Sequence, residues 1–343
     1  MPQRLSLSRA PSFRSQARLA VGLGLTAGLL GLCAIASLGW GAVDIAPRTM
    51  WDALWNFDPS SREHLIIRTV RLPRFLVGTA VGAALGVAGG IMQGLTRNPL
   101  ASPGILGINA GASLAIVVAT LGLGAVSTST SVTFAFLGAG LSAMTVYIVA
   151  SLGGRSVTPL KLTLAGATLA ALLSAIVSGL LVLNQRTLDD IRFWLAGSLA
   201  GRDLQTVWQG LVGIAVGLAI ALLLGKPITV LNLGDDIARS LGQATGRVKA
   251  IAVATVALLA GSSVAIAGPI GFVGLVVPNA VRLFVKSDYR WILAFSALFG
   301  AIALLLADLG ARTLVPSGEL PVGTVVALFG APFFIYLVRW KVG

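Results

Sequence analysis

The chain has 343 residues, of which 56% are hydrophobic and only 11% are charged. A soluble domain carries about 25% charged residues, so the composition excludes an ordinary soluble protein and indicates an integral membrane protein. The formal net charge of +13 does not indicate a nucleic-acid partner, because the basic residues lie in short segments between apolar runs, where they set orientation in the membrane.

The first 16 residues are rich in arginine and contain no acid. They lead into an apolar run with no clear small-residue cleavage site. We therefore expect a basic cytoplasmic tail over residues 1–16 and a single transmembrane domain over residues 17–343. Cys33 is the only cysteine and His64 the only histidine, so we expect neither a disulfide framework nor a metal site.

Apolar runs recur along the whole chain, and a membrane-spanning helix needs roughly 20 apolar residues. The sequence predicts an all-α polytopic membrane protein with about ten transmembrane helices, two of them short or broken. The predicted spans are Ala17–Leu38, Phe75–Gln93, Ile105–Leu123, Val132–Leu152, Leu160–Leu183, Leu204–Leu224, Ala250–Ala267, Gly271–Leu283, Trp291–Leu309 and Val322–Val338. An even number of spans with a cytoplasmic tail places both termini in the cytoplasm, and most basic residues then fall at cytoplasmic ends.

The second span carries a glycine at every fourth position. These glycines share one helix face, which lets another backbone approach closely: Gly78, Gly82, Gly86, Gly90 and Gly94. The helix breaks at Asn98 and Pro99, and broken helices at membrane depth are tolerated only beside protein or a water-filled cavity. We expect this segment, including Gln93, to line a pathway; tight packing alone is the alternative for each glycine.

A second interrupted segment, residues 267–279, contains Pro278 and resembles the first in kind. Paired interruptions of this sort suggest an internal repeat around a central pathway.

The outer ends of two spans carry arginines. Arg71 and Arg74 flank Pro73 before one span, and Arg312 follows another. We predict an exposed, proline-fixed corner that suits carboxylates, with anchoring to membrane lipid phosphates as the alternative. Asp308 is the only acid well inside a span, and we expect it to form a structural pair with Arg312 one turn away rather than a proton relay.

The longest predicted cytoplasmic loop covers residues 226–249. Leu233, Ile237 and Leu241 recur at i, i+4 and i+8, an apolar stripe on a short helix. Asp235 lies at its start, where the helix dipole favours acids, and Gly242 follows its end. A partner subunit could bury this stripe in a groove; the alternative is a helix lying on the lipid surface.

At these residues the sequence resembles the permease family of ABC importers for iron–siderophore complexes, haem and cobalamin. The resemblance is carried by seven sequence blocks in order: RLPR (71–74), MQG (92–94) through NPLA (98–101), PGILG (103–107), residues 231–242, AGPIGFVGLVVP (267–278), AD (307–308), and ELPVG (319–323) with GAPFF (330–334). In one departure, Asn279 stands where many family members have histidine.

The resemblance implies a subunit of the bacterial inner membrane that pairs with an identical or paralogous permease around a central pathway. Cytoplasmic ATPase subunits would hydrolyse ATP-Mg, and a periplasmic or lipid-anchored binding protein would deliver the substrate. The outer arginines would meet acids on the binding protein. The ATPase would receive the coupling loop, whose expected contact residues are Leu233, Gly234, Asp235, Ile237, Ala238, Leu241 and Gly242.

The expected function is therefore the import of a ferric-siderophore-type chelate, with cobalamin or haem as the alternative cargo. No phosphate-binding loop of the form GxxxxGK followed by Ser or Thr occurs, so we expect no cofactor and no enzyme activity on this chain. An ion-coupled secondary transporter is the rival from another class, and the shortage of buried ionisable residues argues against it.

Overall fold

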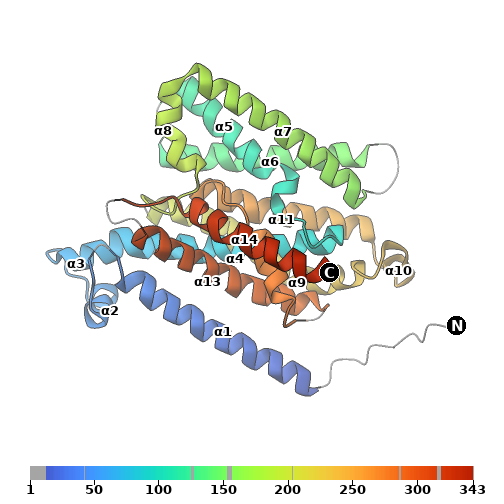
Figure 1. Cartoon of the computed structure of the whole chain (residues 1–343), viewed down its shortest axis with the longest axis horizontal. Coiled ribbons are helices and arrows are strands. Elements are labelled where there is room, and N and C mark those ends of the chain that lie inside the picture. Colours follow the sequence, from blue (N-terminus) through green and yellow to red (C-terminus); the bar gives the residue numbers. More distant parts are fainter. Residues whose placement is uncertain are drawn as a thin grey trace.

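The structure is a computed structural model that describes residues 13–41, 43–124, 127–152, 157–202, 204–285, 287–314 and 318–342. Every regular element in these ranges is helical (Figure 1). The elements are α1 (Phe13–Gly39), α2 (Pro47–Trp55), α3 (Arg62–Leu65), η1 (Ile66–Arg71), α4 (Leu72–Thr96), η2 (Pro103–Leu106), α5 (Ile108–Leu123), α6 (Thr128–Ser151), α7 (Pro159–Leu183), α8 (Gln185–Leu195), α9 (Leu204–Leu231), α10 (Asp235–Ser240), α11 (Thr245–Ala267), α12 (Val273–Val281), α13 (Tyr289–Thr313) and α14 (Val322–Val342).

The predicted all-α polytopic architecture is confirmed. Seven helices of the described chain are long and apolar enough to cross a membrane, namely α1, the continuous helix Arg62–Thr96, α6, α7, α9, α11 and α13. Helices α5 and α14 contain shorter apolar stretches, and α12 has nine residues. Each predicted span overlaps one of these helices, and the total of ten crossings stays a prediction.

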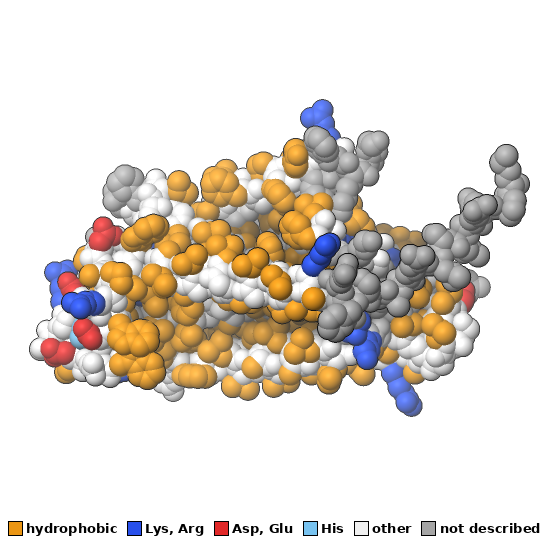
Figure 2. All heavy atoms as spheres, turned by 90° about the horizontal axis from the view of Figure 1, so that it is seen from below, with side chains coloured by type: hydrophobic (Ala, Val, Ile, Leu, Met, Phe, Trp, Pro, Cys, Tyr) orange, Lys and Arg blue, Asp and Glu red, His pale blue; other side chains and the backbone are white. Residues whose placement is uncertain are grey.

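The distribution of hydrophobic and charged side chains on the surface is typical of a membrane protein. Figure 2 shows hydrophobic side chains over the middle of one face, with acidic and basic side chains gathered at the end that carries α2 and α3. Helix α1 begins and α14 ends on the opposite side of the molecule, where α10 also lies (Figure 1). The described ends of the chain are therefore on the same side as the predicted coupling loop.

Helix α4 lies inside the bundle, where it contacts α9, α11, α12 and α13. Its glycine face follows α13 in antiparallel order, because a Cβ added at the five glycines 78, 82, 86, 90 and 94 would meet Leu305, Gly300, Ser296, Leu293 and Tyr289 in turn. A Cβ on Gly82 would lie 2.3 Å from the backbone oxygen of Gly300. The face is filled by α13, joined at Gly94 by Ile228 of α9, so these glycines pack helices together within the subunit.

The predicted corner at Arg71–Arg74 is wrong, because the chain is helical from Arg62 through Thr96. Inside an α-helix a proline lacks the amide donor, and its ring clashes with the carbonyl four residues back. Here the residues before Pro73 form a π-helix, in which Leu72 N donates to Ile67 O five residues back. The wider turn lets the helix pass through the proline without a corner.

The predicted coupling loop is shorter than residues 226–249. Helix α9 continues through Pro227 to Leu231, and α11 begins at Thr245. Ile228 and Leu231 are buried in the bundle, and this burial favours continuing the helix past the proline. The connection is therefore residues 232–244. At the N-terminus, α1 begins at Phe13 within the predicted tail, and residues 1–12 lie outside the described ranges.

One added methyl group tests the contact between α4 and α13. In Gly82→Ala the new Cβ collides with Gly300 O, so we expect a loss of about 1–3 kcal/mol of stability, measured as a lower Tm of the protein purified in detergent. The matched control is Gly140→Ala on α6, where a Cβ meets nothing within 4 Å. Alanine favours helix over glycine, so the control should keep or raise the Tm. Equal Tm values for both variants would contradict the close packing.

Candidate functional site: charge networks at the two ends of helix α4

A network of charged side chains lies at the first turn of α4, and we call it the Asp308 cluster. Its members are Arg74 of α4, Asp308 and Arg312 of α13, and Glu319 from the segment before α14. Arg74 Nε donates to Asp308 Oδ1 at 2.7 Å, and Arg312 Nη2 lies 2.7 Å from Asp308 Oδ2. Arg74 Nη1 donates to Glu319 Oε2 at 2.8 Å. The predicted pair of Asp308 with Arg312 is confirmed. The structure adds Arg74 and Glu319, so a fully buried carboxylate is shared between two guanidinium groups.

Two of the predicted arginines also cap α1. Arg71 Nη1 donates to the backbone oxygens of Leu38 and Gly39, both at 2.6 Å, and Arg312 Nη1 donates to Ser37 O at 3.2 Å. The last carbonyl groups of a helix have no partner within the helix. Cations at that end satisfy them and complement the helix dipole. These arginines therefore fix the end of α1 against α4 and α13.

The expectation that the arginines are exposed is wrong. Arg71 is 5% exposed and Arg74 is 6% exposed, because their guanidinium groups already bind carbonyl and carboxylate groups of the same chain. The Glu319 side chain is 51% exposed, which makes it the most accessible member of the cluster.

A second network lies at the other end of α4 and is centred on Asp235, the first residue of α10. Arg97 Nη2 contacts Asp235 Oδ1 at 2.5 Å, and Lys249 Nζ contacts Oδ2. Arg97 Nε also donates to Leu231 O at 3.2 Å, and Lys249 Nζ donates to Val157 O at 3.2 Å. Asp235 therefore ties α10 to the ends of α4 and α9 and to the start of α11.

The charge of Asp235 is stabilised by these contacts. Partial burial alone would raise the pKa of Asp235, but the hydrogen bond and charge of Lys249, with the charges of Arg97 and Arg239, hold the pKa below its usual value. A depressed pKa means that the network stabilises the fold above the ordinary carboxyl pKa and is lost only when acid protonates Asp235.

The predicted short helix is present as α10, but it covers only Asp235–Ser240, so of the predicted stripe only Ile237 lies on the helix, with Leu233 before it and Leu241 at its C-cap. Leu233, Ile237 and Leu241 are all exposed, whereas Ala238 is fully buried against the bundle. Gly234 and Gly242 have positive φ angles of 130° and 80°, which glycine adopts without steric cost. The two turns present the apolar stripe away from the rest of the chain.

The break after α4 is tied to α12. Arg97 ends α4 in the left-handed conformation, and Asn98 and Pro99 are exposed. Asn279 Nδ2 donates to Pro99 O at 2.7 Å and to Leu275 O at 2.8 Å.

Two more of the predicted pathway residues lie beside this link. Gln93 Nε2 donates to Leu275 O at 3.2 Å, and Pro278 is buried inside α12. The pathway residues predicted near the break thus join α4 to α12, and their part in transport stays a prediction.

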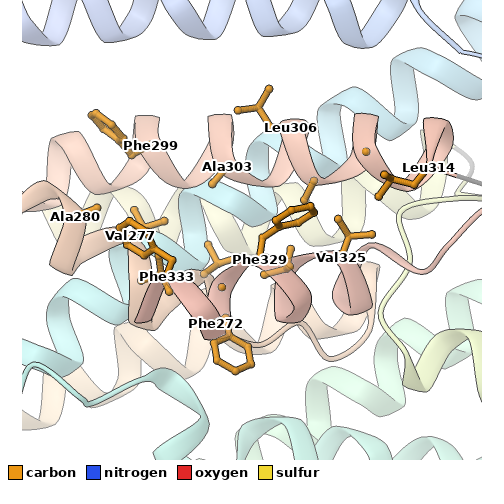
Figure 3. A pocket seen from close by; sticks show the side chains of 16 residues that line it. Phe272, Val277, Ala280, Phe299, Ala303, Leu306, Leu314, Val325, Phe329 and Phe333 are labelled. Carbon is orange, nitrogen blue, oxygen red and sulfur yellow. The ribbon is translucent and has the colours of Figure 1, made fainter. Parts of the chain in front are cut away.

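An apolar cavity of about 540 Å³ lies between α12, α13 and α14. Figure 3 shows its side chains, which include Phe272, Phe299, Phe329 and Phe333. No residue predicted as a site lines this cavity. The only local sign of it is aromatic residues in three separate segments, and sequence spacing does not bring these together.

The comparisons with known proteins decide the family. The sequence matches the FecCD transport family over residues 29–340. The chain belongs to this family.

This FecCD-family chain is 46% identical over 304 residues to a Bacillus subtilis protein named "Probable siderophore transport system permease protein YfiZ", covering 89% of this chain and 91% of the relative. It is 43% identical over 281 residues to the ferric enterobactin transport system permease protein FepD of Escherichia coli, covering 82% and 84%. A solved metal-chelate type ABC transporter in an inward-facing conformation superimposes with a TM-score of 0.82 at 31% identity, covering 94% of this chain and 99% of that chain. The chain is therefore a multi-pass membrane permease of the ABC transporter class.

Neutralising Asp235 tests the network at the C-terminal end of α4. Asp235→Asn removes both ion pairs and leaves the nearly buried Lys249 without its carboxylate, so we expect the free energy of unfolding to fall by about 1–3 kcal/mol. We also expect faster hydrogen exchange over residues 232–244. Asp236→Asn is the matched control, since the neighbouring Asp236 is exposed. The account of the network is wrong if the two variants exchange at the same rate.

Proposed function

We propose that this FecCD-family permease is the membrane-spanning subunit of an importer that carries a ferric-siderophore-type chelate across the bacterial inner membrane. The proposal is supported by relatives whose names specify siderophore, hydroxamate and enterobactin transport. A relative named as a cobalamin import permease is 39% identical over 302 residues, so cobalamin is the alternative cargo.

The single observation that carries the mechanism is the exposed apolar stripe of α10. Three large hydrophobic side chains are exposed here, outside the long apolar spans: Ile237 on α10, Leu233 just before the helix and Leu241 just after it. Exposed apolar residues grouped in this way mark an interaction site, and a short amphipathic helix binds by laying its apolar face in a groove. We propose that the groove belongs to a cytoplasmic ATPase subunit.

Movement of α10 would reach the transport pathway through the Asp235 network. Asp235 binds Arg97 at the end of α4. Two residues further on, the backbone oxygen of Pro99 accepts a hydrogen bond from Asn279 of α12. Because α4 is a continuous buried helix, it would move as a rigid body when α10 is displaced.

The other partners act at the opposite end and beside the chain. A periplasmic or lipid-anchored binding protein would dock over the Asp308 cluster and deliver the chelate, and a second permease, identical or paralogous, would complete the pathway. We propose that this chain hydrolyses no ATP itself and that the partner ATPase supplies the energy.

Placing a charge in the apolar stripe tests the ATPase interaction. We expect Leu233→Asp and Leu241→Asp each to abolish co-purification of the ATPase subunit, because the groove would have to bury a carboxylate. The matched control, Ser240→Asp, adds the same charge to the same short helix at an exposed polar position and should retain the ATPase. Retention of the ATPase by the two leucine variants, with transport intact, would refute the coupling role.

A further inference from the structure

We propose that Glu319 forms an ion pair with Arg74 in the free transporter, and that a carboxylate of the substrate-binding protein displaces Glu319 when that protein docks. This inference rests on the proposed docking at the outer end of α4. It assigns a role to Glu319, which sequence spacing alone does not indicate as a site residue.

The two carboxylates bound to Arg74 differ in how firmly they are held. Asp308 is fully buried within α13, and its carboxylate also pairs with Arg312. Glu319 lies between α13 and α14, and its side chain is 51% exposed while Arg74 is 6% exposed. Glu319 can therefore rotate into solvent without disturbing the helices, whereas Asp308 cannot leave.

The charge balance requires an exchange of carboxylates rather than a simple release. Within the Asp308 cluster, two guanidinium groups face two carboxylates. Removing one partner of a buried pair leaves an uncompensated charge, which is strongly unfavourable. Arg74 would therefore keep Glu319 until another carboxylate is available, and the incoming group must carry the same charge.

The surroundings favour an acidic protein partner. Arg71 lies close enough to the cluster to feel the charge of Arg312, and its guanidinium group donates to the neutral backbone oxygens of Leu38 and Gly39, so its positive charge adds to that of the cluster. Once Glu319 has left, the guanidinium groups of Arg74 and Arg312 share the single carboxylate of Asp308. Arginine forks bind carboxylates in two-point geometry, so an aspartate or glutamate on the partner fits the vacated position.

Removing the carboxylate of Glu319 should strengthen docking of the substrate-binding protein rather than weaken it. In the assembled permease–ATPase complex in nanodiscs, we expect Glu319→Gln to bind the substrate-binding protein encoded with this permease about threefold to fivefold more tightly than the wild type, because a competing partially exposed ion pair is gone. The matched control is Glu63→Gln on α3, an exposed acid at the same end of the molecule. It removes the same charge without touching Arg74, and binding should change little.

Substituting Arg74 distinguishes the role of Glu319 from the docking itself. Arg74→Lys keeps the positive charge but cannot bridge two carboxylates, so binding should weaken, and adding Glu319→Gln to this variant should no longer strengthen it. If the Arg74→Lys variant binds the substrate-binding protein as tightly as the wild type does, the docking role of Arg74 is refuted. Binding that weakens in Arg74→Lys, while Glu319→Gln equals Glu63→Gln or weakens binding, would overturn the role of Glu319 alone.

Discussion

The close contact between α4 and α13 is the constraint on which the rest of the structure depends. Glycines on α4 bring its backbone against the backbone of α13 at Gly300 and Ser296. The same antiparallel register continues one turn further, where Arg74 meets Asp308. The ion pair and the glycine face are therefore parts of one interface. A shift in register would separate the buried charges as well as create steric clashes, and this coupling fixes the two helices relative to each other.

The interface makes α4 a rigid link between two charged regions. Arg74 and Arg97 lie 23 residues apart on one helix, a length of about 35 Å, which spans the hydrocarbon core of a bilayer. The Asp308 cluster, with its exposed Glu319, lies at the N-terminal end of this helix, and the anchor of α10 lies at its C-terminal end. In the proposed transporter, docking above and nucleotide-driven movement below would act on the same helix.

The sequence predicts features that depend on near neighbours along the chain. Apolar runs locate the helices, the four-residue spacing identifies the glycine face of α4, and the i, i+4 spacing identifies the pair of Asp308 and Arg312. The short helix α10 follows from the acids at its start and the glycine after its end, although only Ile237 of the predicted apolar stripe lies on it. These predictions succeed because helical periodicity fixes which side chains share a face.

The features that the sequence did not predict depend on distant contacts. Arg74 is separated by 234 residues from Asp308 and by 245 residues from Glu319, so the arginine was expected to be exposed. The π-helix before Pro73 depends on how the helix accommodates the pyrrolidine ring of that proline. The cavity between α12, α13 and α14 depends on how these three helices pack. Composition and spacing carry no information about such contacts.

Transport by reconstituted liposomes tests the central claim most directly, namely that this chain is a passive conduit powered by a partner. The permease would be reconstituted alone, and together with its ATPase and binding protein, and uphill uptake of a ferric hydroxamate would be measured with and without ATP. The account predicts accumulation only in the complete system with ATP. Sustained uphill uptake by the permease alone, dependent on an imposed proton gradient, would contradict it and favour a secondary transporter.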